Sequence, residues 1–184
     1  MKKKKLLLIS SIGGHLTQLL QLEPLFKKYD YHLVTEKSEI TKQLKSKYPV
    51  SFLVYGARNY PFRYIFKFSY NIVKSLFIFL RERPDVVITT GVHTSVPMCY
   101  IAKLFRKKVI FIESFAKSSS PTLAGRMVYP IADLFIVQWE SMKKVYPKAV
   151  YGGQSIDFCR IRNTRASIYS FVKRSGKLEK NRCD

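Results

Sequence analysis

Three short clusters of glycine, hydroxyl and ionisable side chains are the parts of this sequence best suited to chemistry. They are Gly13, Gly14 and His15 in the first cluster, His93 and Thr94 in the second, and Glu113 and Ser114 in the third. Glycines let a backbone approach a ligand closely, and the free N–H groups at the start of a helix attract phosphate. Histidine and glutamate serve as general bases. The clusters therefore predict a site that binds an anion and activates a hydroxyl group.

Each cluster also has a purely structural interpretation. Gly13-Gly14-His15 is neither a Walker loop nor a GxGxxG motif, and a tight turn before a helix explains it equally well. His15 and His93 can each be a general base, a phosphate ligand or a solvated polar residue. Glu113 ends an apolar run, where a carboxylate either faces a cleft or pairs with Lys117. We predict that Glu113 acts as a base or binds a hydroxyl group of a ligand.

Alternating strands and helices would position these clusters. Short apolar runs precede them at Leu6–Ser10, Val86–Ile88 and Lys108–Ile112, as expected of parallel strands that are buried on both faces. Further strands are expected at Tyr31–Glu36, Ser51–Tyr55 and Ala132–Trp139, and helices at Leu16–Phe26, Ser38–Lys47 and about Thr94–Phe105. This order predicts an α/β fold with a Rossmann-like parallel sheet, whose strand ends carry all three clusters to one rim.

The composition indicates a folded domain with an anionic partner. Of 184 residues 47% are hydrophobic, and 33 basic against 12 acidic side chains give a net charge of +21. Nucleic acid, an acidic membrane and phosphorylated substrates all suit this charge, but no nucleic-acid-binding motif is present, so we predict no nucleic-acid partner. The three cysteines are scattered and no DxD pair occurs, so we expect no disulfide, metal or bound cofactor.

The segment Pro61–Arg83 is expected to form a helix that lies in the bilayer interface. On a helix its basic side chains share one narrow stripe, while aromatic and aliphatic side chains cover the remaining surface. The residues expected at the membrane are Arg63, Lys67, Lys74, Phe77 and Arg81. A crossover helix buried against the sheet or a partner subunit is the alternative. We expect peripheral or monotopic attachment to an anionic membrane surface, at the cytoplasmic face of the plasma membrane.

The regular pattern ends near residue 153 and divides the chain into two parts. Residues 1–153 are expected to form the Rossmann-like domain, and residues 154–184 a basic C-terminal extension that is mobile or weakly helical. Near the start, Leu6–Ile9 is too short for the apolar region of a signal peptide. We interpret this run as the first buried strand.

Five segments, taken in order, resemble a known family. They are Ser11–His15, Pro84–Gly91, Glu113–Lys117, Ala132–Trp139 and Tyr151–Gly153. The pattern resembles the oligosaccharide-biosynthesis family that includes the membrane-anchoring subunit of the split N-acetylglucosaminyltransferase of N-glycan assembly. It looks closer still to bacterial accessory subunits of β-1,4-galactosyl- or glucosyltransferases for capsule and exopolysaccharide. The resemblance covers about residues 5–153.

The resemblance implies the N-terminal, acceptor-binding half of a GT-B glycosyltransferase, with a UDP-sugar-binding partner subunit that holds most of the donor. It implies transfer of a hexose from a UDP-sugar to a polyprenyl-diphosphate-linked saccharide in capsule or exopolysaccharide synthesis. The lipid diphosphate would meet Gly13, Gly14 and His15. The other expected ligands are His93, Thr94, Ser114 and Glu113, with Gln138 and Trp139 at the subunit contact or cleft floor.

Two other functions remain open from the sequence. The chain can be a non-catalytic membrane anchor or enhancer of the partner transferase, in which case changes at His15 and Glu113 would leave activity intact. It can also be a small sugar-modifying enzyme that acts alone. The lack of an adjacent nucleophile–base pair or metal cluster argues against the second alternative.

Overall fold

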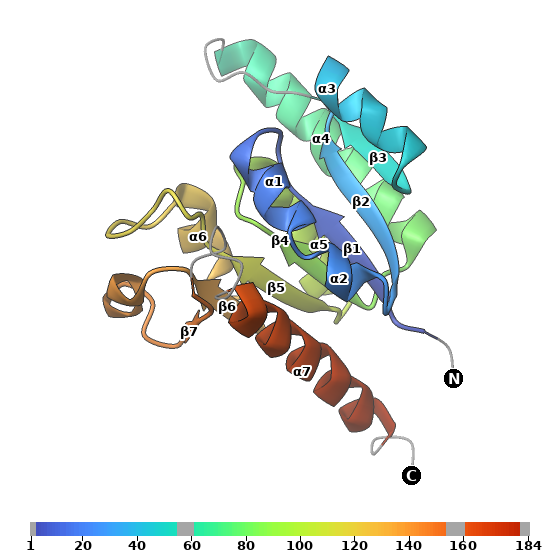
Figure 1. Cartoon of the computed structure of the whole chain (residues 1–184). Coiled ribbons are helices and arrows are strands. Elements are labelled where there is room, and N and C mark those ends of the chain that lie inside the picture. The colour runs from blue at the N-terminus through green and yellow to red at the C-terminus, as the bar shows by residue number, and fades with distance from the viewer. Residues whose placement is uncertain (1–2, 55–60, 154–160, 181–184) are drawn as a thin grey trace.

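The computed structural model describes residues 3–54, 61–153 and 161–180, and it contains a seven-stranded parallel sheet with the order β3-β2-β1-β4-β5-β6-β7 (Figure 1). The strands are β1 (Lys5–Ile9), β2 (Asp30–Glu36), β3 (Val50–Leu53), β4 (Val86–Thr89), β5 (Lys108–Ile112), β6 (Leu134–Val137) and β7 (Val150–Tyr151). Every neighbouring pair is parallel. The predicted α/β class with a Rossmann-like sheet is confirmed.

The strand order reverses between β1 and β4. From β1 the chain adds β2 and β3 on one side, then returns and places β4 against the other side of β1, with Leu6 opposite Val86 and Ile9 opposite Thr89. Such a reversal opens a crevice at the carboxyl ends of the two central strands, where ligands of open α/β sheets bind. The first two clusters follow these strands.

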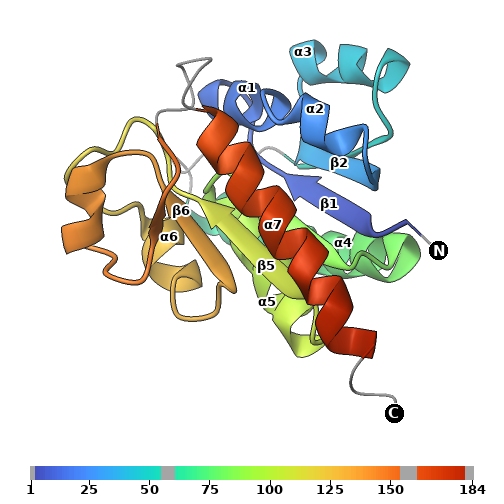
Figure 2. The same ribbon diagram turned by 60° about the horizontal axis from the view of Figure 1, so that its bottom comes forward.

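Helices cover both faces of the sheet (Figure 2). They are α1 (Gly14–Leu20), α2 (Glu23–Phe26), α3 (Glu39–Lys42), α4 (Pro61–Glu82), α5 (Val96–Leu104), α6 (Leu123–Val128) and α7 (Ile161–Lys180), with single 3₁₀ turns at Gln43–Ser46, His93–Ser95 and Glu140–Lys144. Helices α4, α5 and α6 share one core with residues of alternate parity along the strands, such as Leu7 and Val87. Helices α1, α2 and α7 cover the opposite face, where Leu8 and Ile88 lie.

Three local features differ from the prediction. The helix expected over residues 16–26 divides into α1 and α2, because Pro24 lacks the N–H that would continue the helical bonds. Helix α6 was not predicted; it begins after Thr122, whose side chain accepts a hydrogen bond from the Gly125 amide. Strand β7 was also missed, since two residues are too few to show a period.

Helix α7 packs on the sheet, which differs from the mobile or weakly helical extension expected after residue 153. Ile168 and Val172 are fully buried in the core that also contains the β1 and β4 side chains. The Thr164 hydroxyl donates to the Gly152 carbonyl at 2.9 Å, and Arg165 Nε donates to the Gln21 carbonyl at 3.2 Å. The sequence did not reveal this packing because the few apolar residues of this polar helix contact β5 and β6 residues that are distant in the sequence.

Truncation of Ile168 to alanine tests whether α7 belongs to the folded domain. Removing a fully buried isoleucine side chain is expected to lower the free energy of unfolding by about 2–5 kcal/mol. The control is Tyr169→Ala, because that neighbouring side chain is 38% exposed and should cost less. Urea denaturation followed by circular dichroism measures both, and equal small losses would show that α7 is not part of the cooperative unit.

Candidate functional site

The three predicted clusters meet at the carboxyl ends of β1, β4 and β5. Gly14, His15 and Ser114 line a cavity of about 420 Å³ together with residues of α1 and the loop after β5. His15, Gly91 and His93 line a second cavity of about 280 Å³. His15 belongs to both cavities and therefore lies at the centre of this rim.

The glycine turn after β1 borders open space. Gly13 has φ of +79°, a left-handed conformation that glycine adopts at little cost and other residues rarely adopt. A Cβ atom placed on Gly13 or Gly14 would meet no other atom within 4 Å. No side chain caps the start of α1. Its first N–H groups are therefore left to bind a ligand or water.

A reciprocal pair of hydrogen bonds with Thr90 fixes His15. His15 Nδ1 lies 2.7 Å from the Thr90 carbonyl oxygen, and the Thr90 hydroxyl donates to the His15 carbonyl at 2.9 Å. A carbonyl oxygen only accepts, so Nδ1 carries the proton and donates it. In the neutral ring Nε2 is then the unprotonated atom. His15 thus has the tautomer in which Nε2 can accept a proton as a general base.

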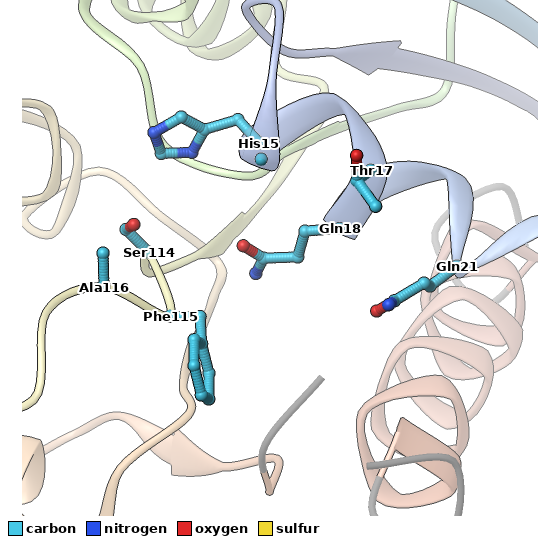
Figure 3. A pocket seen from close by; sticks show the side chains of 8 residues that line it. His15, Thr17, Gln18, Gln21, Ser114, Phe115 and Ala116 are labelled. Carbon is cyan, nitrogen blue, oxygen red and sulfur yellow. The ribbon is translucent and has the colours of Figure 1, made fainter. Parts of the chain in front are cut away.

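The larger cavity has a mostly apolar lining, to which Thr17, Gln18, Gln21 and Ser114 add uncharged polar groups (Figure 3). Gln18 and Gln21 extend from α1 toward the loop that carries Ser114 and Phe115. Gln18 is buried, and its amide nitrogen lies 3.4 Å from the Glu113 carbonyl oxygen. Amides, hydroxyls and an aromatic ring are groups that bind the hydroxyls and the apolar face of a sugar.

The smaller cavity differs in charge from the larger one. Lys117 contributes an ammonium group, and His93 joins His15 as a second imidazole. No Asp or Glu side chain lines this cavity. Leu123, at the start of α6, forms part of its wall and is 59% exposed. The cavity therefore combines positive charge with an apolar edge.

Glu113 faces inward, and the geometry does not favour its expected role as a base or sugar ligand. Its side chain is 1% exposed and accepts hydrogen bonds from the Ser114 amide at 2.8 Å, the Thr122 hydroxyl at 2.8 Å and the Tyr146 hydroxyl at 3.0 Å. Among the residues that the structure describes, Glu113 forms no ion pair with Lys117. It connects β5 to the start of α6 and to the segment after Glu140–Lys144. Burial and the adjacent Glu113 charge raise the pKa of Tyr146, so its hydroxyl stays a donor.

The remaining expected ligands lie at different depths. Ser114 and Thr94 are both buried, and His93 is half-buried at the start of a 3₁₀ turn. Gln138, from the end of β6, donates to the Glu113 carbonyl at 2.7 Å, and Trp139 Nε1 donates to the Phe115 carbonyl at 2.7 Å. Gln138 and Trp139 thus support the loop after β5 from beneath.

Glu36 is a rim residue that the sequence reasoning missed. Its carboxylate is 2% exposed at the end of β2, beside the Ile12 backbone and the Thr94 side chain. Burial raises the pKa of Glu36, while the nearby Ile12 backbone and Thr94 side chain act in the opposite direction. The one sequence signal for Glu36 is that, like Glu113, it stands at the end of an apolar strand. Glu36 connects the glycine turn to the turn after β4.

The profile of the oligosaccharide biosynthesis proteins described as Alg14-like matches residues 8–155. The chain belongs to this family. A mouse relative named UDP-N-acetylglucosamine transferase subunit ALG14 is 31% identical over 180 residues, and the match covers 83% of each chain. The predicted family is thereby confirmed.

Solved structures place this Alg14-like chain among GT-B-type proteins. MurG of Acinetobacter baumannii superposes with a TM-score of 0.62 at 14% identity, over 75% of this chain and 42% of that chain. UDP-N-acetylglucosamine 2-epimerase of Rickettsia bellii gives 0.65 at 17% identity, over 84% and 46%. At such identities the likeness concerns the fold. The chain spans just under half of each of these proteins, as predicted for one half of a GT-B fold.

The expected hexose transfer in bacterial capsule or exopolysaccharide synthesis is wrong. The mouse relative is named for N-acetylglucosamine, and the matching family is that of the Alg14-like proteins. The expected closer kinship with bacterial capsule subunits is not supported. What is confirmed is the coarser prediction, a glycosyltransferase subunit with a Rossmann-like fold.

Helix α4 of this Alg14-like chain buries both polar and apolar residues, since Ile78 and Phe79 belong to the core. Asn71 and Ser75 are buried, and the Asn71 amide bonds the backbone N–H and carbonyl of Val54 at 2.9 and 2.8 Å. Its exposed apolar residues are Phe66, Tyr70, Ile72, Val73, Leu76, Phe77 and Leu80. Exposed apolar side chains continue onto α5 at Tyr100, Leu104 and Phe105. We call these ten residues the apolar face.

The basic residues of α4 lie along one border of the apolar face. Lys67 is exposed, Lys74 lies over the Tyr70 ring at 5.6 Å, and Arg81 forms an ion pair with Glu82 at 2.7 Å. The side chain of Arg63 lies outside the described residues. In the described part of the chain, α4 and every other helix is too short or too polar to span a bilayer.

Proposed function

We propose that this chain is the acceptor-binding subunit of a two-chain transferase that moves N-acetylglucosamine from UDP-N-acetylglucosamine to a lipid-linked diphosphate saccharide. The observation that carries the proposal is the family membership of a chain that spans about half of a GT-B fold. A half-fold with an open rim needs a second chain to close the cleft, and the mouse relative is named a transferase subunit.

The chemistry of the rim suits such an acceptor. Glycosyl transfer requires a base for the acceptor hydroxyl and positive charge near phosphate groups. His15 presents an unprotonated Nε2 in its neutral form, because Nδ1 is bonded to the Thr90 carbonyl. Lys117 supplies positive charge next to it, and His93 adds a second imidazole that can donate a hydrogen bond. The partner chain would hold the nucleotide of the donor.

Reconstitution tests this proposal directly. The chain alone, a candidate partner chain alone and both together are supplied with labelled UDP-N-acetylglucosamine, UDP-glucose or UDP-galactose in membranes that contain lipid-diphosphate saccharides. We expect transfer only with both chains and only from UDP-N-acetylglucosamine. Equal transfer by the partner alone would overturn the acceptor-binding role and favour a non-catalytic anchor, and transfer by this chain alone would favour a complete small enzyme.

We also propose that the apolar face rests on an anionic membrane, as a lipid-linked acceptor requires. Phe66 and Phe77 are 77% and 67% exposed, which is unusual for aromatic residues of a water-soluble surface. Lys67 and Lys74 at the border would lie near the headgroups, where each cation contributes about 1 kcal/mol. This arrangement matches a helix that lies in the plane of the interface.

Substituting Val73 and Phe77 together by serine should weaken membrane binding at least about tenfold, because two exposed apolar side chains would no longer enter the lipid. The measurement is co-sedimentation with vesicles of phosphatidylcholine and phosphatidylglycerol. Val145→Ser is the control, because Val145 is also exposed. It precedes β7, which lies at the opposite edge of the sheet from β3, the strand that α4 contacts. Equal binding by the double variant and the control would show that the apolar face contacts protein instead.

A further inference from the structure

The two cavities beside His15 differ in charge although they share that residue. The larger cavity is lined by Thr17, Gln18 and Gln21 of α1, and by Ser114 and Phe115 of the facing loop. Among the residues that the structure describes, His15 is the only ionisable side chain that lines it. The smaller cavity contains Lys117 and His93. A ligand that carries a neutral part and an anionic part would meet complementary groups in only one orientation.

We infer that the acceptor, given the proposed function, lies across His15 with its sugar in the larger cavity and its diphosphate in the smaller one. Lys117 and His93 would bind the diphosphate oxygens, and the amide of Gln18 with the hydroxyls of Thr17 and Ser114 would bind the sugar. This assigns Lys117 and the α1 polar side chains as ligands, and it moves the main diphosphate contact away from the glycine turn.

The position of Leu123 supports this orientation. Leu123 lines the diphosphate cavity and is 59% exposed, and Met127, one turn further along α6, is 43% exposed. Tyr100 of the apolar face donates through its hydroxyl to the Met127 carbonyl at 2.9 Å. An apolar path therefore leads from the smaller cavity along α6 to the apolar face. A lipid chain attached to the diphosphate could leave by this path, whereas the described residues that line the larger cavity include no Lys or Arg for the diphosphate.

The size of the larger cavity also suits a sugar. Its volume of about 420 Å³ lies within the range of about 300–1,000 Å³ typical of small-molecule sites. Gln18 is buried, so its amide is held in place instead of moving in solvent. Phe115 stands opposite α1 in Figure 3, where its ring can pack against the apolar face of a pyranose.

Binding to the full chain tests the assignment without any transfer reaction. The probes are inorganic pyrophosphate, UDP, farnesyl diphosphate and farnesyl diphosphate bearing one N-acetylglucosamine, each measured by calorimetry. We expect Lys117→Met to weaken binding of all four probes about tenfold, since it removes a charge-assisted hydrogen bond. Lys143→Met is the matched control, because Lys143 is another exposed lysine that lines neither cavity.

Three further variants separate the cavities and the sources of phosphate. Thr17→Val and Gln18→Met should abolish the affinity gained from the sugar but leave pyrophosphate binding unchanged; Thr17 is exposed, so its variant should fold normally. Leu123→Ser should remove the preference for farnesyl diphosphate over pyrophosphate and UDP. Loss of pyrophosphate binding in Thr17→Val, or a preference for UDP over farnesyl diphosphate, would overturn the assignment. Failure of the proposed function would instead appear as a lack of transfer in the two-chain assay.

Discussion

Replacing His15 by alanine is expected to lower the turnover of the two-chain transferase by about 10²–10⁴-fold, the usual contribution of a general base. The reason is the fixed tautomer: the Thr90 carbonyl accepts from Nδ1, so Nε2 of the neutral ring is free to take the proton of an acceptor hydroxyl. His15 is half-buried, and its removal takes one donor away from the Thr90 carbonyl, so the fold should persist.

Two measurements distinguish this role from simple binding. His15→Ala should lower kcat far more than it raises KM for the acceptor, because a general base acts on the acceptor once it is bound. His93→Gln is the comparison, because His93 lines only the smaller cavity. This variant should raise KM for the acceptor more than it lowers kcat. If His15→Ala keeps more than about a tenth of the turnover, the base belongs to the partner chain.

The sheet and its rim could be predicted because their signals are local. Continuous apolar runs such as Val86–Ile88 indicate strands that are buried on both faces, and glycine or hydroxyl residues follow where those strands end. Parallel strands then bring distant segments to one edge by topology alone. The meeting of Gly14, His15 and Ser114 around one cavity agrees with that reasoning.

Side-chain direction could not be predicted in the same way. Glu113 and Glu36 end apolar strands, and the sequence is the same whether their carboxylates face the cleft or the interior. The deciding partners are distant: Thr122 and Tyr146 for Glu113, and Ile12 with Thr94 for Glu36. A buried carboxylate is tolerated only where such donors converge, and that convergence exists only in the folded chain.

Helix α4 shows a similar limit. The helical period correctly separates a basic stripe from a broad apolar surface, but it does not indicate which side meets the sheet. Asn71 is buried because its side-chain amide bonds the backbone N–H and carbonyl of Val54, just after β3. This contact orients α4 so that Phe77 is exposed. The exposed apolar residues are thus available to contact another surface. The sequence alone did not decide whether this helix meets a membrane, the sheet or a partner subunit.

Replacing Glu113 by alanine is expected to lower the free energy of unfolding by about 3 kcal/mol or more. The Ser114 amide and the Thr122 and Tyr146 hydroxyls would each lose a buried acceptor, and each such loss costs about 1–3 kcal/mol. Glu113→Gln keeps the side-chain volume and one carbonyl acceptor, so it should lower the free energy of unfolding by less than Glu113→Ala does. Urea denaturation of both variants, with Tyr146→Phe for a double-mutant cycle, measures the coupling.

The same variants decide between positioning and catalysis. A positioning role predicts that Glu113→Gln, assayed at a temperature where it is folded, retains most of the turnover of the two-chain enzyme; a base at this position would lose it almost entirely. Gly125→Ala offers an independent route, because its Cβ would collide with the Glu113 carboxylate and the Tyr146 hydroxyl without removing either. It should destabilise the chain as Glu113→Ala does. A stable but inactive Glu113→Gln would contradict the positioning role and restore Glu113 as a candidate base.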